Sequence, residues 1–144
     1  MRISEVLRHK GNKVVLLRPD DTVNDMLAIL AEERIGAAVV SSDGGLTVAG
    51  MASERDIVRA LHARGTSVLE EPVRAIMTTQ VWTCSPSDEL EVLAVSMTEH
   101  RVRHLPVIED GALVGLVSIG DVVKARLEEL QDERRHLLDY VQGD

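Results

Sequence analysis

The chain has 144 residues, a formal net charge of -8, 44% hydrophobic residues, one Trp, one Tyr and no Phe. These numbers fit one compact unit, or two small halves sharing an aliphatic core, and they exclude the basic, aromatic-rich face of a nucleic-acid binder. Any flat ligand is therefore expected to lie between aliphatic groups. The single cysteine, Cys84, fits a reducing cytoplasm. Without a signal peptide or an apolar run of roughly 20 residues, no membrane insertion is expected.

In chain order, the first half is predicted as a short leading helix over residues 3–7 and then a β-α-β-β-α unit. An extended run covers residues 13–19, and a helix runs from Thr22 to about Glu33. An apolar strand (AAVVS), an Asp-Gly turn and a second strand (TVAGMAS) follow. The last helix of the unit begins at Ser53.

The second half repeats this order 67 residues later, after a polar linker over residues 63–72. The offset falls to 65 after the turn, so the first half has two extra residues between Gly44 and Gly50. Each leading segment is expected to serve its own half, with the first repeat over 1–66 and the second over 67–127. The second-half elements are predicted at 73–77 (leading helix), 80–86 (extended), 87–100 (helix), 104–108 (strand) and 113–118 (strand).

The C-terminal stretch, with an extension over 128–144, is predicted as one helix from Val122 to Val141, longer than the repeat needs. One alternative is a helix that lies on its own domain, and the other is a subunit or partner contact through a short seam like that of a coiled coil. We favour the contact. The apolar stripe is interrupted by Arg134 and consists of Val123, Leu127, Leu130, Leu137 and Val141.

A doubled motif carries the functional signal: GMASERD over residues 50–56 and GLVSIGD over residues 115–121. In its simplest interpretation, Ser-x-x-Asp is a capping box at the start of a helix. However, the motif follows a Gly, opens a helix whose N-terminus favours anions, and occurs in both halves. One carboxylate can accept from two ribose hydroxyls. The pattern therefore also predicts a nucleotide, with its ribose on Asp and its phosphate near Ser.

The repeat resembles a tandem pair of cystathionine-β-synthase (CBS) domains, a Bateman module. The matching marks are IMT over residues 76–78, RHLPVIEDG over residues 103–111, and GxxSxxD opening the last helix of each half. The resemblance implies an α/β fold of two β-α-β-β-α repeats with pseudo-twofold symmetry and two clefts, and often a homodimer. It also implies binding of AMP, ADP or ATP, or in some members NAD or S-adenosylmethionine, and a regulatory role without catalysis.

Carried over by this resemblance, Asp56 and Asp121 would bind ribose, and Ser53 and Ser118 would lie beside ribose or phosphate. Cations in an otherwise acidic chain add Arg55, Arg103 and His104 as candidate phosphate contacts, with a solvated surface position as the alternative for each. We assign these three to neither cleft, because phosphate contacts can come from the opposite half. The adenine slots would be lined by Val14, Val15, Gly36, Ala37, Ala38, Val81, Thr83, Leu105 and Pro106.

Other chemistries have weaker support. His100 and His104 flank the predicted junction between helix and strand, so they are not expected to share a metal. No nucleophile motif or phosphate loop is present in the sequence, and Cys84 is expected to pack in the core or line a cleft. The prediction is a non-catalytic, cytoplasmic sensor of adenine nucleotides that signals to an unknown effector protein. The alternatives are an NAD(H) or S-adenosylmethionine sensor, a ligand-free interaction module, and a nucleotide-processing enzyme.

Overall fold

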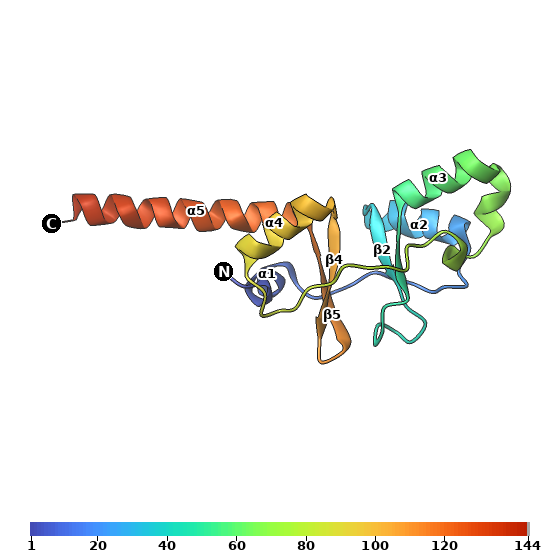
Figure 1. The fold of residues 1–144 in the computed structure, drawn as a ribbon, viewed down its shortest axis with the longest axis horizontal. Helices are drawn as coiled ribbons and strands as arrows, with labels where there is room; N and C mark the ends of the chain where they lie inside the picture. Colours follow the sequence, from blue (N-terminus) through green and yellow to red (C-terminus); the bar gives the residue numbers. More distant parts are fainter. Residues whose placement is uncertain (144) are drawn as a thin grey trace.

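The computed structural model describes residues 1–143, which form the two predicted halves and a long C-terminal helix (Figure 1). In the first half, β1 pairs in parallel with β2, and β2 pairs antiparallel with β3. The α/β repeat predicted from the sequence is therefore confirmed. The elements of this half are β1 (Leu16–Leu17), α2 (Val23–Glu33), β2 (Ala37–Val40), β3 (Gly50–Ser53) and α3 (Glu54–Arg64).

The second half is built around one antiparallel hairpin, whose two-residue turn is Asp110-Gly111. Both turn residues have positive φ, 51° and 79°, as such a turn requires. The predicted extended run over residues 80–86 forms no strand: only Cys84 bridges to Val107 of the hairpin. The elements are α4 (Leu90–His100), β4 (His104–Glu109), β5 (Ala112–Ser118) and α5 (Ile119–Gln142).

The helix starts follow the capping residues. Thr22, Ser53 and Ser118 each accept a hydrogen bond from the backbone N–H three residues later, and each forms a capping box with an Asp at that position. Helix α4 begins three residues later than predicted, at Leu90. The reason is a turn closed by the Ser85 N–H, which donates to Asp88 Oδ2 at 2.8 Å and delays the first helical turn.

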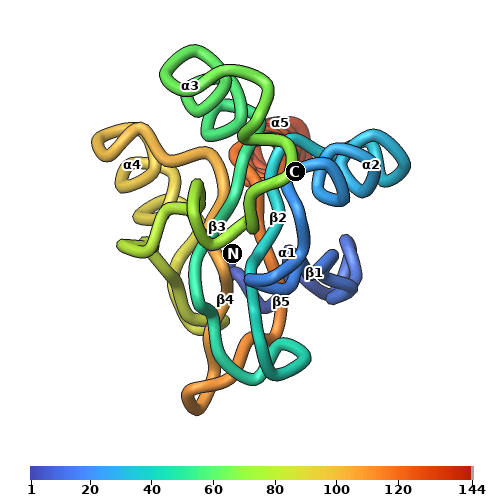
Figure 2. The backbone as a smooth tube through the Cα atoms, turned by 90° about the vertical axis from the view of Figure 1, so that its right-hand side faces the viewer, coloured from blue at the N-terminus to red at the C-terminus, as the bar shows by residue number. Residues whose placement is uncertain are grey.

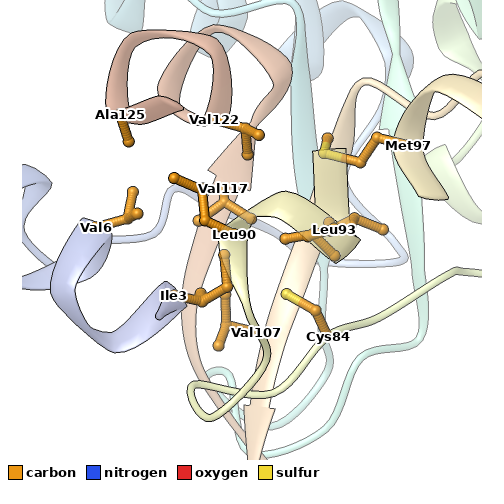
Figure 3. Packing of buried hydrophobic residues seen from close by; sticks show 11 residues of the cluster. Ile3, Val6, Cys84, Leu90, Leu93, Met97, Val107, Val117, Val122 and Ala125 are labelled. Atoms are coloured by element: carbon orange, nitrogen blue, oxygen red, sulfur yellow. The ribbon is translucent and has the colours of Figure 1, made fainter. Parts of the chain in front are cut away.

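The leading helix α1 (Ile3–Lys10) packs against the second half, not the first. Figure 3 shows Ile3 and Val6 pointing into the second core, beside Leu90 and Val122. The prediction that each leading segment serves its own half is therefore wrong for packing. The apolar face of α1 finds a core there because residues 11–15 carry the chain across to β1 of the other half.

The segment that leads into the second half makes the opposite crossing. It forms a short 3-10 helix, η2 (Val73–Ala75), and Val73 is fully buried in the first core. The Val73 N–H donates to the Asp21 carbonyl at 2.7 Å. The linker before it is also packed, because η1 (Thr66–Glu70) buries Val68 completely. Each core therefore contains a segment from the other half of the sequence.

The halves lie side by side, with their hairpin turns on the same side (Figure 1). Viewed end-on in Figure 2, the strands lie in the middle and α2, α3 and α4 lie around them. Helix α5 projects away from this body, and its side chains from Gln131 to Gly143 are all exposed. This arrangement brings the start of α3 and the start of β4 to opposite walls of one cleft.

Candidate functional site

One candidate site is a cleft of about 710 Å3 lined by both halves. We call it the first cleft because it contains the first copy of the doubled motif. Its walls are the start of β2, the β3–α3 junction, residues 78–82, and the α4–β4 junction. The volume lies within the range of roughly 300–1,000 Å3 that is typical of small-molecule sites.

The motif residues Ser53 and Asp56 lie at the floor of this cleft, where β3 turns into α3. Asp56 Oδ2 accepts from the Ser53 N–H at 2.9 Å and from the Ser53 hydroxyl at 3.1 Å. Both residues thus form the capping box, the simplest interpretation of the sequence. The partly exposed carboxylate still faces the cleft and retains acceptor capacity on Oδ1. Capping and ligand binding are compatible at this position.

The glycine that opens each motif lets a neighbouring segment approach closely, which is one of the two roles that the sequence predicts, the other being close approach of a ligand. A Cβ on Gly50 would lie 2.6 Å from the Thr78 carbonyl oxygen, and a Cβ on Gly115 would lie 2.7 Å from the Leu7 side chain. Each glycine therefore admits the crossing segment that precedes a half. These close neighbours account for both glycines without a ligand.

Three arginines line the first cleft in a chain whose net charge is -8: Arg55, Arg101 and Arg103. Arg55 and Arg103 are two of the predicted phosphate contacts, and both are exposed. The third predicted contact, His104, also lines the cleft. Burial and the nearby Lys10 ammonium lower its pKa below the usual value. His104 is therefore neutral at pH 7 and offers a hydrogen bond instead of a positive charge.

The only tryptophan of the chain, Trp82, also lines the first cleft and is 55% exposed. Its ring stacks on the ring of His100, with centroids 4.1 Å apart and an angle of 18° between the planes. Trp82 thus adds one aromatic surface to the aliphatic lining that the composition predicts. An aromatic plane held in place by stacking offers a surface for a heterocyclic base.

The predicted adenine-slot residues separate into three groups. Gly36, Ala37 and Val81 line the first cleft. Ala38 and Leu105 face the two hydrophobic cores, so their side chains do not line it. Neither of the two cavities described here is lined by the remaining four. Of these, Pro106 is buried, Thr83 is exposed, and Val14 and Val15 are partly buried.

The second copy of the motif forms the same capping box. Asp121 Oδ2 accepts from the Ser118 N–H at 2.9 Å, and the Asp121 N–H donates to Ser118 Oγ at 3.1 Å. Its surroundings differ, because Asp121 lines a separate cavity of about 340 Å3 between α1 and α5. The Lys10 ammonium lies 2.5 Å from Asp121 Oδ2. The two halves therefore present their matching aspartates in unlike settings.

Arg101 and Trp82 are cleft residues that the sequence analysis did not select. Arg101 ends α4 with a left-handed backbone, φ 54°, which turns the chain toward β4. Trp82 lies in a segment with no regular strand pairing, so alternation of side chains could not place it. The signal that could have identified Trp82 is its uniqueness in a chain so poor in aromatic residues.

Two further observations concern residues 1–143. Within this range, no cluster of three or more His, Cys, Asp or Glu side chains could hold a metal ion. No helix in the same range is long and apolar enough to cross a membrane.

Cys84 is buried in the second core, which is one of the two positions predicted for it. Burial raises the pKa of its thiol to about 12.

Known proteins share both the sequence pattern and the fold. The family model described as CBS domain matches residues 3–63 and 73–128. A relative, the mitochondrial CBS domain-containing protein CBSX3 of Arabidopsis thaliana, is 36% identical over 148 residues. That match covers 98% of this chain and 72% of the relative.

Two solved structures are informative. The CBS-domain containing protein ATU1752 from Agrobacterium tumefaciens superposes with a TM-score of 0.83 at 39% identity, covering 88% of this chain and 99% of the other. The CBS domain protein PAE2072 from Pyrobaculum aerophilum, solved in complex with AMP, superposes with a TM-score of 0.73 at 33% identity. That match covers 84% of this chain and 89% of the other.

Proposed function

Because the chain belongs to the CBS domain family, as a tandem pair of repeats, we propose that its first cleft binds an adenosine nucleotide and that occupancy of the cleft signals to a partner protein. The ligand we expect is AMP, with ADP and ATP as close relatives. The family supplies the class, a regulatory module built from two repeats. The residues of the first cleft supply the argument for the ligand.

The observation that carries this proposal is the combination of groups around the first cleft. A carboxylate (Asp56), a flat aromatic surface (Trp82) and three arginines line one space of about 710 Å3. Arginines suit phosphate oxygens because the guanidinium donates in a planar fork. A nucleoside monophosphate contains the three matching parts: a diol, a flat base and an anion.

Within this proposal, the α3 N-terminus and Ser53 would lie near the phosphate, because free N–H groups and the helix dipole favour an anion there. The base would lie toward Trp82, Val81 and Ala37, and the ribose would lie on the Asp56 carboxylate. AMP in the related Pyrobaculum aerophilum structure supports the choice of an adenosine ligand. NAD and S-adenosylmethionine are the competing ligands to test.

Signalling requires that the nucleotide binds one arrangement of the halves more tightly than another, since only that difference can do regulatory work. Walls from both halves make the first cleft suited to such a difference. We propose a regulatory role without catalysis, exerted on an effector protein of unknown identity. We also propose a cytoplasmic location, which rests on the cysteine content alone.

A second copy of this chain is the partner that we propose for the exposed face of α5. Val123, Leu127, Leu130, Leu137 and Val141 are exposed and lie at spacings of four, three, seven and four, a seam interrupted at Arg134. The exposed part of α5 over residues 131–142 is about as short as the isolated helices that are marginal in water, so a covering partner would stabilise it. The α5 helix of a second copy of the chain carries the same apolar stripe.

Trp82 provides the direct test of the nucleotide proposal, because the only tryptophan lines the cleft. Its fluorescence should change on titration with AMP and saturate, and calorimetry should report the same dissociation constant. NAD and S-adenosylmethionine, added in competition, should displace AMP only at higher concentrations. If none of these compounds changes the fluorescence or releases heat, the ligand-free alternative is the correct one.

A further inference from the structure

The two aspartates of the doubled motif differ in their counter-ions. Lys10, the last residue of α1, donates from Nζ to Asp121 Oδ2 at 2.5 Å and to the Leu116 carbonyl at 2.7 Å. Within residues 1–143, Asp56 has no such lysine or arginine partner: its carboxylate accepts only from Ser53. The contact joins residues 111 positions apart and brings a cation into the motif of the second half.

The residues at the equivalent positions of the first half explain this difference. Gln80, which carries no charge, is the equivalent of Lys10, because Leu7 lies against Gly115 as Met77 lies against Gly50, an offset of 70 residues in these leading segments. The Met51 carbonyl, equivalent to that of Leu116, accepts from the Thr78 backbone N–H at 2.8 Å. A backbone bridge in the first half is thus replaced by a side-chain ammonium in the second. Among residues 1–143, Asp56 therefore has no cationic partner, whereas Asp121 pairs with Lys10.

The Lys10–Asp121 pair is partly shielded from water. The two side chains are 34% and 25% exposed, so the pair is screened less than a fully exposed one. Burial raises the pKa of Asp121, but hydrogen bonds from Lys10 and Ser118 lower it more, and the net pKa is below the usual value. Asp121 is therefore ionised at neutral pH, and Lys10 is its partner.

We infer that Lys10 occupies the ribose-binding position of the second half, so that the protein binds one nucleotide per chain, in the first cleft. This inference rests on the proposed function and states which aspartate serves it. Ribose hydroxyls approaching Asp121 meet a carboxylate that is already paired through Oδ2 with an ammonium, and this ammonium also bonds a β5 carbonyl. Displacement would leave that ammonium and the Leu116 carbonyl without their present partners.

Lys10 also links the two regions electrostatically. His104 lines the first cleft, and its pKa responds to Lys10, Asp121 and Arg103. Burial is the largest cause of the lowered pKa of His104, and the Lys10 ammonium lowers it further. Lys10 therefore excludes a ligand from one half and contributes to the charge of the site in the other.

Lys10→Met, which removes the ammonium but keeps a long unbranched side chain, tests the inference by calorimetric titration with AMP. We expect one AMP per chain for the wild type and two for K10M. Asp56→Asn should weaken binding to the wild-type chain about 100-fold, whereas K10M/D56N should retain one tight site. Lys124→Met is the matched control, because Lys124 lines the same small cavity without bonding Asp121. It should still bind one AMP.

Two AMP molecules per wild-type chain, or one per K10M chain, would overturn the inference while leaving the proposed function intact. No AMP binding by either protein would overturn both. Lys10 is an exposed residue at the end of α1, and Lys10→Gln provides a second variant in case K10M fails to fold. K10Q should also bind two AMP molecules, and a stoichiometry of one would again contradict the inference.

Discussion

Asp56→Asn separates the two roles that we assign to the Asp56 carboxylate, helix capping and ribose binding. Asn keeps one acceptor oxygen for the capping box but removes the negative charge from the first turn of α3. We therefore expect the free energy of unfolding to fall by about 0.5–1 kcal/mol. For a chain of this length, the midpoint of thermal unfolding would fall by about 1–4 °C.

The expected effect on AMP binding is larger. Two ribose hydroxyls on a carboxylate form charge-assisted hydrogen bonds, each worth about 1.5–3 kcal/mol. Because Asn accepts them less strongly, we expect the affinity for AMP to fall roughly 100-fold, or about 2.8 kcal/mol. Trp82 fluorescence titration measures the affinity, and a thermal melt without ligand measures the stability.

Asp121→Asn is the matched control, since it weakens the same capping box in α5. It should lower the melting temperature by a similar amount and leave the AMP affinity nearly unchanged, because Lys10 already occupies Asp121. A fall of less than about threefold in AMP affinity for Asp56→Asn would refute the ribose assignment. Equal losses for both variants would refute the distinction between the two halves.

Four further predictions concern the fold and its surfaces. Ile3→Ala should lower the free energy of unfolding, measured in urea, by about 2–5 kcal/mol, because Ile3 is fully buried in the second core. A loss below about 1 kcal/mol would contradict that packing. The pKa of His104 is lower in the folded protein than its ordinary value. As the pH falls through about 6.5, the unfolded chain therefore takes up a proton at His104 before the folded protein does, and the free energy of unfolding should decline. His104→Asn should flatten that decline between about pH 6.5 and 5, and an unchanged slope would contradict it. Sedimentation should show Leu137→Glu as a monomer, whereas the similarly exposed Leu46→Glu should form the proposed dimer, as we expect of the wild type; a dimeric L137E would exclude α5 as the interface. Burial raises the pKa of the Cys84 thiol to about 12, so Cys84 should react with a thiol reagent at neutral pH only after the protein unfolds. Rapid labelling of the native protein would contradict this.

The order of elements in each half could be predicted because it depends on local signals that occur twice. Apolar spacing, the Asp-Gly turn and the capping residues Ser53 and Ser118 gave the same unit in two independent stretches. The exchange of leading segments could not be predicted in this way. A helix with the apolar face of Ile3 and Val6 fits either core, and only the path of residues 11–15 decides which one it joins.

The candidate site was predictable to a similar extent. The motif identified Ser53 and Asp56, and charge identified Arg55 and Arg103, which the structure brings to one cleft. Trp82 lies in an irregular segment, where no periodicity assigns a face. Contacts between residues far apart in the sequence could not be predicted either. No residue near Asp121 in the sequence indicates that a lysine of the first helix would pair with it.

The structure of the protein with AMP bound would test the central claim most directly. We predict one nucleotide in the first cleft, with its ribose hydroxyls on Asp56, its base against Trp82 and its phosphate beside Arg55, Arg101 or Arg103. Lys10 should remain on Asp121 in that complex. AMP bound away from Asp56, or a first cleft left empty at saturating AMP, would contradict the account.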